Sequence, residues 1–191
     1  MTALQLVLAS ASPRRRDLLA RLGVEPSQVI ATDIDETPHS RELPRVYAQR
    51  MAREKGAAAG VTGAHVLSGD TVVACGRRIL PKAEDEATAR LCLKLLSGRR
   101  HTVFSAIALR APDGTVRERL SETIVRFKQL QPAEIDNYIS RDEWRGKAGG
   151  YAIQGTAEGL IAWISGSHSG VVGLPLFETR AVLLAAGFFL A

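Results

Sequence analysis

The sequence predicts an α/β fold with a mixed sheet, and three observations support that prediction. The chain has 191 residues, 46% hydrophobic and 24% charged, which is the composition of an ordinary globular protein with a buried core. Short apolar runs typical of buried strands recur along the chain. Segments of helical period lie between them without strict alternation, so the sheet is expected to be mixed. The length fits one domain, or two halves that share a cleft.

The chain opens with a predicted strand, turn and helix. Residues 4–9 form an apolar run of the kind that makes a buried strand. The period changes over residues 10–13, where Ser12 can cap a helix whose first residue is Pro13. Gly23 is suited to end that helix.

The rest of the chain continues to mix strands and helices. Apolar runs predict strands over residues 29–31, 64–74, 79–80, 102–109, 117–127, 160–164 and 170–172. Helical period predicts helices over residues 44–59, 83–96 and 131–139, and a last helix that starts near Pro175. The strand over 64–74 is expected to break at Ser68-Gly69-Asp70, and Pro112-Asp113-Gly114 indicates a hairpin.

Cysteine usage and the apolar ends of the chain bear on location. Cys75 and Cys92 have neither the number nor the spacing of a disulfide scaffold or zinc ribbon, so a reducing cytoplasm is the expected location. Arginines follow, rather than precede, the first apolar run, which is the wrong order for a signal peptide. The apolar run over residues 181–191 is shorter than the roughly 20 residues that span a bilayer, so it predicts a core helix and no membrane partner.

The net charge of +5 is concentrated in arginine clusters at residues 14–16, 77–78 and 99–100. Such clusters suit nucleic acid, anionic lipid or a phosphorylated small molecule, and the alternative is a solvated basic face. Aromatic residues make up 5% of the chain and do not interleave with the arginines, which disfavours a base-stacking surface. The expected partner is therefore a small phosphorylated ligand and not nucleic acid.

Several common catalytic motifs are absent from the sequence. The chain has no GxxxxGK[ST] loop, no GxGxxG and no HExxH, so P-loop, dinucleotide-fold and zincin interpretations lack support. His168 stands where a GxSxG elbow would carry its nucleophile, which argues against a serine hydrolase.

The turn before the first helix is a candidate anion site. Ser10, Ser12, Arg14 and Arg15 bring hydroxyl and guanidinium groups to the point where a strand end meets a helix N-terminus. Phosphate oxygens are the ligands that such groups bind. The alternative is that Ser12 only caps the helix and the arginines are solvated.

Four charged residues elsewhere have the chemistry that triphosphate cleavage needs. Asp70, at the expected strand break, can bind a hard cation or take a proton from water, or it can be an ordinary turn aspartate. Glu36 lies in an acidic loop, where simple solvation is the alternative. Lys55 and Lys82 can neutralise phosphate, or be an exposed helix lysine and an exposed loop lysine.

Together these residues resemble the Maf family of nucleoside triphosphate pyrophosphatases, and the resemblance covers nearly the whole chain. The N-terminal motif is SxSPRRxxLL, found here over residues 10–19. The other motifs follow in family order at residues 35–36, 52–55, 69–73, the Lys82 loop, 96–98 with 101–103, 146–155, and 171–176 with Glu178.

The resemblance implies a fold and a reaction. The fold is an elongated mixed sheet flanked by helices with a deep central cleft, similar to that of inosine triphosphate pyrophosphatases. It would form one domain over residues 1–191, with two lobes around the cleft. The reaction is hydrolysis of a nucleoside triphosphate to the monophosphate and pyrophosphate, with a divalent metal ion such as Mg²⁺ or Mn²⁺. A homodimer is the default expectation for such an enzyme.

The resemblance also implies roles for the charged residues. Asp70 matches the proton acceptor of the family, and Glu36, Lys55 and Lys82 match charged residues that line its cleft. Glu36 and Asp70 are the expected metal ligands. Many members have proline after the cleft lysine, whereas Ala83 follows here, so a less rigid loop is expected.

Base selection is implied for Arg14, Thr71 and Gln154. The Tyr-Ala-Ile-Gln-Gly sequence around Gln154 resembles the branch that acts on dTTP and UTP rather than the branch that acts on 7-methyl-GTP. An amide there can pair with the donor–acceptor edge of a pyrimidine. A different class of function also stays open, namely a nucleotide-binding regulator of cell division that has no significant turnover.

Overall fold

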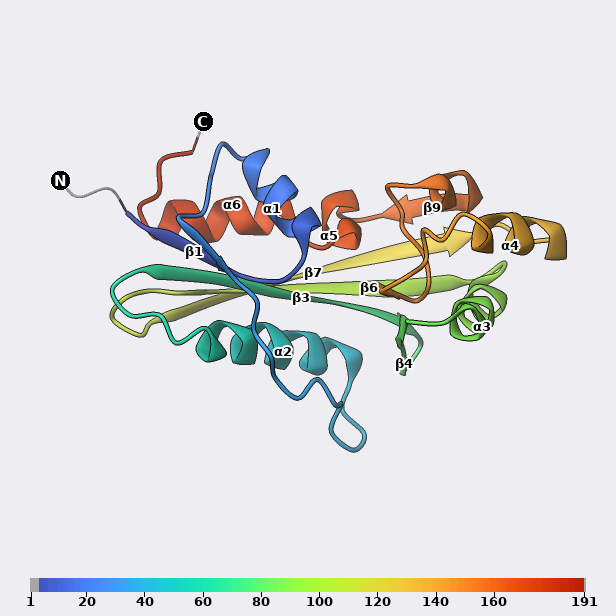
Figure 1. The fold of residues 1–191 in the computed structure, drawn as a ribbon, viewed down its shortest axis with the longest axis horizontal. Coiled ribbons are helices and arrows are strands. Elements are labelled where there is room, and N and C mark those ends of the chain that lie inside the picture. The colour runs from blue at the N-terminus through green and yellow to red at the C-terminus, as the bar shows by residue number, and fades with distance from the viewer. Residues whose placement is uncertain (1–3, 191) are drawn as a thin grey trace.

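The computed structural model describes residues 4–190, and within them a mixed sheet of seven strands forms the long axis of the molecule (Figure 1). Strand β1 runs parallel to its neighbours β2 and β3, whereas the other strand pairs of the sheet are antiparallel. The predicted mixed α/β fold is therefore confirmed. In sheet order the strands are β2 (Gln28–Ile30), β1 (Leu6–Ala9), β3 (His65–Cys75), β6 (Arg100–Arg110), β7 (Val116–Phe127) and β9 (Ile161–Ser165), with β4 (Arg78–Leu80) paired to β3.

Three long strands give the sheet its length. β3 and β6 are 11 residues each and β7 is 12, and they pair along most of their length. The turn between β6 and β7 is the predicted hairpin, closed by a hydrogen bond of 2.8 Å from Ala111 N to Thr115 O. Burial alternates along the first half of β6 and along the second half of β7. Local sequence was therefore sufficient to predict these two strands.

Helices cover both faces of the sheet (Figure 1). The helix α2 (Pro44–Ala58) packs on β3 and β6, where Met51 is fully buried. On the other face lie α1 (Pro13–Ala20), α5 (His168–Val172) and α6 (Leu176–Ala185). Their apolar side chains meet those of β1 and β3 in one cluster.

A second group of elements gathers at one end of the sheet. It contains α3 (Glu86–Leu96), α4 (Pro132–Ile139), the 3-10 helix η1 (Thr156–Leu160) and a two-stranded ribbon of β5 (Lys82–Ala83) with β8 (Lys147–Ala148). Their apolar cluster includes Phe127, Trp144 and Tyr151.

The predicted break in β3 at Ser68-Gly69-Asp70 was wrong. The strand is continuous, and these three residues pair with Ala108, Ile107 and Ala106 of β6. A Cβ on Gly69 would lie 3.0 Å from Ala106 O, so the glycine permits close approach of the two strands. Pairing of all three residues with β6, and of Ser68 with β1 as well, outweighs the turn tendency of the sequence. Asp70 therefore projects from a rigid central strand, not from a turn.

Two further expectations for secondary structure need correction. The predicted strand over 170–172 is part of helix α5, which begins where the Ser167 side chain accepts a hydrogen bond of 3.0 Å from Gly170 N. The helix expected from residue 83 begins at Glu86, because Asp85 caps it and Ala83 belongs to β5. In both cases side-chain capping outweighs the apolar pattern.

The chain ends also differ in detail from the predictions. Helix α1 begins at Pro13 as expected, but the Ser12 side chain makes no capping hydrogen bond. The predicted helix over 181–191 is confirmed only to Ala185, after which Gly187 (φ 89°) turns the chain, and Ala191 lies outside the described residues. The single domain predicted over 1–191 includes residues 1–3, which also lie outside them, and it stays a prediction.

Within residues 4–190 no helix combines the length and the apolar character needed to cross a membrane. Cys75 and Cys92 are both free thiols.

Candidate active site

One cavity of about 350 Å³ lies beside strand β3. It is lined by the turn into α1, by the β5–β8 ribbon and by residues 151–154 and 171–173, with isolated residues from the loop before α2 and from α2 itself. Its size is in the range of small-molecule sites. All of the predicted site residues line it. They are Ser10, Ser12, Arg14, Arg15, Glu36, Lys55, Asp70, Thr71, Lys82 and Gln154.

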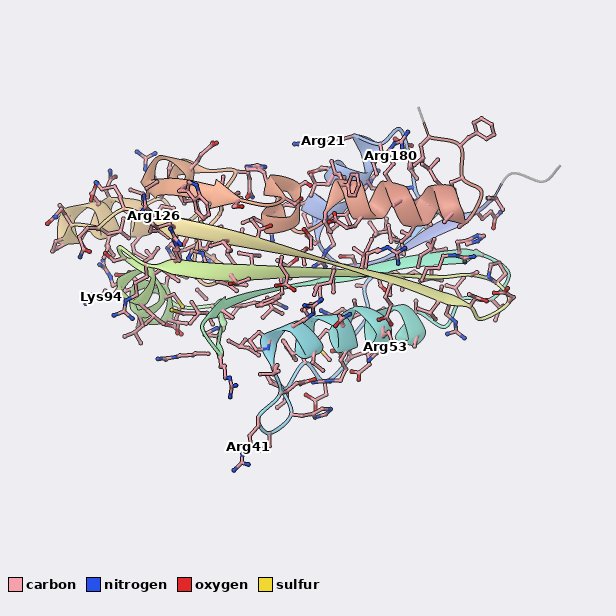
Figure 2. The ribbon with its side chains drawn as sticks, turned by 180° about the vertical axis from the view of Figure 1, so that it is seen from behind. Arg21, Arg41, Arg53, Lys94, Arg126 and Arg180 are labelled. Carbon is pink, nitrogen blue, oxygen red and sulfur yellow. The ribbon has the colours of Figure 1, made fainter. Side chains whose placement is uncertain are left out.

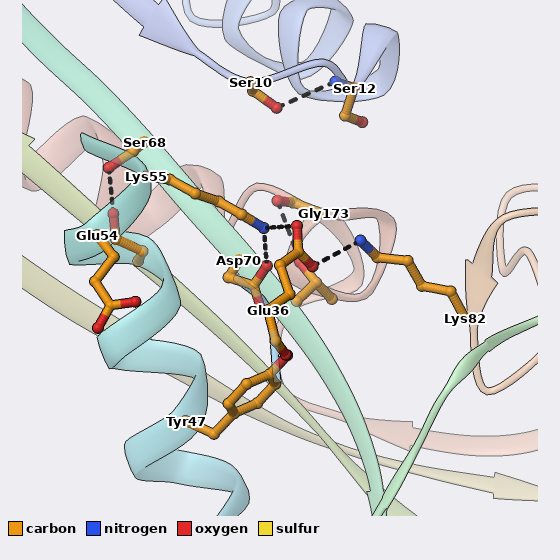
Figure 3. Close-up of polar contacts among 12 residues, drawn as sticks. Ser10, Ser12, Glu36, Tyr47, Glu54, Lys55, Ser68, Asp70, Lys82 and Gly173 are labelled. Atoms are coloured by element: carbon orange, nitrogen blue, oxygen red, sulfur yellow. Dashed lines mark hydrogen bonds and ion pairs between the residues drawn. The ribbon is translucent and has the colours of Figure 1, made fainter. Parts of the chain in front are cut away.

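The centre of the cavity is a chain of ion pairs (Figure 3). Lys55 Nζ lies 2.7 Å from Asp70 Oδ1 and 2.9 Å from Glu36 Oε1. Lys82 Nζ lies 2.9 Å from Glu36 Oε2. Lys55 and Asp70 are only 7% and 5% exposed, so the alternatives of an exposed helix lysine and an ordinary turn aspartate are wrong.

Close packing of α2 on β3 places Lys55 beside Asp70. The Ser68 hydroxyl donates a hydrogen bond of 2.6 Å to Ala52 O, which ties the helix to the strand. A Cβ on Gly56 would lie 2.7 Å from that same hydroxyl oxygen. The small residue at position 56 therefore lets the helix approach, and its neighbour Lys55 reaches the carboxylate on β3.

Glu36 comes from the loop between β2 and α2, and hydrogen bonds hold that loop in place. Tyr47 Oη donates to Glu36 O at 2.6 Å. Arg50 donates to both carboxylate oxygens of Glu42 at 2.8 Å and to Thr37 O at 3.1 Å. The Arg50 guanidinium lowers the pKa of Glu42 to about 2.

The pKa values around Glu36 reflect burial and the neighbouring charges. Burial by itself would raise the pKa of Glu36, but hydrogen bonds from Lys82 and Lys55 outweigh it, and the pKa is lowered. Burial, together with the negative charges of Asp70 and Glu36, raises the pKa of Tyr47 to about 12. Near neutral pH the loop therefore presents an ionised carboxylate, and a neutral phenol holds its backbone.

Lys82 lies in strand β5 rather than in a loop. Its neighbour Ala83 is fully buried and pairs with Lys147 of β8, and Gly146 N donates to Ala83 O at 2.8 Å. The less rigid loop expected from the alanine is therefore a paired strand.

The N-terminal turn brings its hydroxyl and guanidinium groups to the same cavity. Ser10 Oγ accepts hydrogen bonds from Ser12 N at 3.2 Å and from Arg15 Nη1 at 3.1 Å. Arg15 also donates from Nε to Gly173 O at 2.8 Å and from Nη2 to Thr71 Oγ1 at 3.4 Å. Burial lowers the pKa of both Arg14 and Arg15. Among residues 4–190, neither guanidinium lies within ion-pair distance of a carboxylate.

Sequence reasoning gave no role to Lys147, a further cation that lines the cavity. Its Nζ donates to Arg145 O at 2.8 Å. Burial, and then the positive charge of Arg14, lower the pKa of Lys147. The available signal was its place in the glycine-rich motif, but only the β5–β8 ladder shows that it stands near Lys82.

Gln154 also lines the cavity. This residue is exposed, whereas Tyr151, Ala152 and Ile153 before it are buried. A hydrogen bond of 3.0 Å from Gly155 N to Ala152 O closes a turn around it. The carboxamide can both donate and accept hydrogen bonds, which suits the edge of a nucleobase.

Other basic side chains are distributed over the surface. Arg16, next to the two cavity arginines, is exposed. Figure 2 shows further basic residues on both sides of the sheet and at one end of it, namely Arg21, Arg41, Arg53, Lys94, Arg126 and Arg180.

The fold and this cavity define an α/β protein with a positively charged cleft suited to a polyphosphate. A family model described as "Maf-like protein" matches residues 5–186. The chain belongs to the Maf family.

Curated relatives resemble the chain along nearly its whole length. A dTTP/UTP pyrophosphatase from Novosphingobium aromaticivorans is 68% identical over 185 residues, covering 96% of this chain and 92% of the relative. A dTTP/UTP pyrophosphatase from Rhodospirillum rubrum is 60% identical, covering 96% and 88%.

Among solved structures, a HAM1 protein from Coxiella burnetii matches with a TM-score of 0.51 and 16% identity. It covers 96% of this chain and 100% of that structure. This likeness concerns the fold alone, and it agrees with the expected elongated sheet and helices.

Proposed function

We propose that the protein hydrolyses nucleoside triphosphates, dTTP and UTP above all, to the monophosphate and pyrophosphate. The observation that carries this proposal is the charge of the cavity, where five cationic side chains meet two carboxylates. The excess of three positive charges suits a triphosphate. The reaction and the preferred bases come from the relatives named dTTP/UTP pyrophosphatase.

Asp70 is the proposed proton acceptor. It would take the proton of a water molecule whose oxygen bonds to the α-phosphorus, while the bond from that phosphorus to the bridging oxygen breaks and pyrophosphate leaves. Lys55 Nζ binds Asp70 Oδ1 at 2.7 Å, which leaves Oδ2 available either to the water or to a bound divalent ion. Because the pair is buried, the cation acts on the reacting groups with little screening.

The phosphates are proposed to lie between the N-terminal turn and the ribbon. Ser10, Ser12, Arg14 and Arg15 line the cavity on one side and Lys82 on the other. Arg14 has no carboxylate partner within residues 4–190, so its charge is available to phosphate.

Glu36 and Asp70 are the proposed ligands of a divalent ion, Mg²⁺ or Mn²⁺. They are the two carboxylates of the cavity, and both bind Lys55. Mg²⁺ is commonly bound by one or two carboxylates and by substrate phosphates, so the donor type fits it. Lys55 and Lys82 hold both Glu36 oxygens and Asp70 Oδ1, so an ion would bind at Asp70 Oδ2 and displace a lysine from Glu36. Such an ion, when bound, neutralises charge on phosphate oxygens. No group of three or more His, Cys, Asp or Glu side chains in residues 4–190 is placed to hold a metal, so other ligands would be phosphate and water.

Gln154, Arg14 and Thr71 are the proposed base-selecting residues. The Gln154 amide would donate to a carbonyl of thymine or uracil and accept from N3–H. Arg14 would orient the ring or the α-phosphate. Thr71 Oγ1 lies 3.4 Å from Arg15 Nη2 and 3.2 Å from Ser105 Oγ, which supports a role in holding the cavity wall.

The protein is further proposed to act in the cytoplasm as a homodimer, without a nucleic-acid or membrane partner. Light scattering tests the oligomeric state, because a dimer has twice the 20.6 kDa mass of the chain. A monomer at micromolar concentration would contradict the dimer and leave the proposed reaction unaffected.

Pyrophosphate release tests the reaction. The wild type is incubated with Mg²⁺ and dTTP, UTP, CTP, GTP or 7-methyl-GTP, next to Asp70→Asn and the control Glu25→Gln, an exposed carboxylate outside the cavity. We expect Asp70→Asn to lower kcat by at least ~100-fold with an unchanged circular dichroism spectrum. Near wild-type turnover would remove Asp70 from the mechanism. No release by the wild type would favour the nucleotide-binding regulator.

A further inference from the structure

Two buried hydrogen bonds, unused in the proposed mechanism, attach the segment that precedes Gln154 to the protein core. Tyr138 Oη, from helix α4, accepts from Ala152 N at 3.0 Å. Tyr151 Oη lies 2.8 Å from Nε2 of His101, on strand β6. All four residues are buried, while Gln154 is exposed in the cavity.

The groups that make these two bonds are neutral near pH 7. Burial lowers the pKa of His101 to about 4 and raises the pKa of Tyr138 to about 12. Burial also raises the pKa of Tyr151 above its usual range. The charge state of this attachment is therefore constant at physiological pH.

The hydrogen bond between His101 and Tyr151 joins two buried groups that depend on each other. His101 Nδ1 is buried and has no hydrogen-bond partner in the described part of the chain. Among residues 4–190, His101 Nε2 and Tyr151 Oη each have the other as their hydrogen-bond partner. Removing either group therefore leaves the other unpaired in the core.

Aromatic packing restricts the same groups. The His101 ring stacks on Phe127 with centroids 5.7 Å apart. The Tyr151 ring meets His101 and Phe127 edge-on, at 5.5 and 5.1 Å. Because Phe127 is 1% exposed, this cluster belongs to the core, and Tyr151 cannot move without opening a cavity.

We propose that Tyr138, Tyr151 and His101 are positioning residues for base selection. They fix the position of the backbone of residues 151–153 relative to the core. The Gln154 amide is therefore held at hydrogen-bonding distance from the edge of the base. Donor–acceptor distances outside a narrow range do not make a hydrogen bond, so a small displacement is sufficient to lose the discrimination. The inference rests on the role proposed for Gln154 above.

The first test compares UTP with CTP, which differ at the edge that the amide would read. Tyr138→Phe leaves Ala152 N–H without its partner, and the segment must shift for that group to reach water. We expect the ratio of kcat/KM for UTP to that for CTP to fall at least about fivefold, the lower end of the effect of an unpaired buried donor. The loss should reside in KM for UTP, with kcat changed less than about twofold.

Tyr47→Phe is the matched control. It also removes one hydroxyl from a buried tyrosine that holds a loop of the cavity, but at Glu36 O. We expect it to lower kcat for UTP and CTP alike and to leave their ratio unchanged. Tyr151→Phe is the second test variant, expected to lower the ratio as Tyr138→Phe does, and it decides the matter if Tyr138→Phe does not fold.

An unchanged ratio of kcat/KM for UTP to that for CTP in the folded variants would overturn this inference. If both nucleotides lose activity equally, the three residues have a merely structural role. An active wild type with either result leaves the proposed function intact. A wild type that releases no pyrophosphate from UTP or CTP would instead overturn the proposed function, and this inference with it.

Discussion

Two segments that line the cavity are held in different ways. The loop of Glu36 is held mainly by charge, through Arg50 with Glu42 and through the two lysines that bind the Glu36 carboxylate, with one neutral hydrogen bond from Tyr47 to Glu36 O. The segment before Gln154 is held by neutral hydrogen bonds inside an apolar cluster. Each arrangement suits the part of the substrate that we propose it faces. Charged neighbours respond to phosphate and metal, whereas a base edge is read by fixed neutral groups.

The ion pairs at the phosphate end also differ in exposure. The Lys82 side chain is 51% exposed and that of Glu36 is 35%, whereas Lys55 and Asp70 form the buried pair. Exposed pairs are weakened by salt, and a buried pair that loses one member is strongly destabilised. Substitutions in either segment test this contrast between charged and neutral support.

Removing the charge of Lys55 should have the largest effect. Lys55→Met leaves the Asp70 and Glu36 carboxylates without their shared cation, and breaking a buried pair costs about 3–5 kcal/mol of unfolding free energy. Urea denaturation measures the change, with the exposed Lys94→Met as control, expected within about 0.5 kcal/mol of wild type. A Lys55→Met protein as stable as the control would show that the pair adds nothing to folding.

Replacing the side-chain amide of Gln154 should give the next largest effect. Gln154→Glu turns the donor into an acceptor that faces a carbonyl, so kcat/KM for dTTP and UTP should fall by ~5- to 150-fold, the equivalent of about 1–3 kcal/mol. GTP does not use that pairing and should lose less. Kinetics on dTTP, UTP, CTP and GTP measure this difference. Equal losses on all four would mean that Gln154 is structural or catalytic.

Lys147 should contribute one positively charged hydrogen-bond donor to phosphate binding. Lys147→Met should weaken the binding of pyrophosphate about tenfold, the scale of a hydrogen bond to a charged group. Isothermal titration calorimetry with pyrophosphate and Mg²⁺ measures the affinity. Arg21→Met, at an exposed arginine outside the cavity, is the control and should bind as wild type does. Wild-type affinity in Lys147→Met would exclude the lysine from the phosphate site.

Glu42→Gln should have the smallest effect and a distinct pH dependence. The folded pKa of Glu42 is lowered from 4.5 to about 2, so its stabilisation is complete above pH 4.5 and is lost as the pH falls toward 2. We expect the variant to be about 1 kcal/mol less stable than wild type at pH 7, with the difference gone near pH 2.

The salt dependence of stability distinguishes the ionic contacts of the Glu36 loop from the neutral hydrogen bonds of the segment before Gln154. Urea melts at low and high NaCl should show that the Glu42→Gln difference shrinks with salt, because it is ionic, but by less than for an exposed pair, since the Arg50 and Glu42 side chains are 12% and 5% exposed. The destabilisation in Tyr138→Phe should not change, because that hydrogen bond is neutral and buried. An equal salt dependence in both variants would show that the Glu36 loop and the segment before Gln154 are not stabilised by different kinds of interaction.

Much of the architecture could be predicted from local patterns. The alternation in β6 and β7 and the turn between them are contained in consecutive residues, and so is the amphipathic period of α2. The candidate site residues could also be chosen, because their types carry the chemistry and their motifs resemble those of a family. The predictions were wrong where residues distant in the chain determine the conformation. The turn-like sequence Ser68-Gly69-Asp70 is held extended by pairing with β6, and at Ser68 also with β1.

The sequence by itself determined which residue types are available: the carboxylates, the cations, the amide at position 154 and the apolar runs that make strands and helices. Only the tertiary structure decided that Lys55 is buried between two carboxylates, that Lys147 joins the cavity, and that Tyr138 holds the segment before Gln154. The physical reason is that these contacts join residues far apart in the chain. Their distances depend on how helices pack on the sheet, and no local period records that packing.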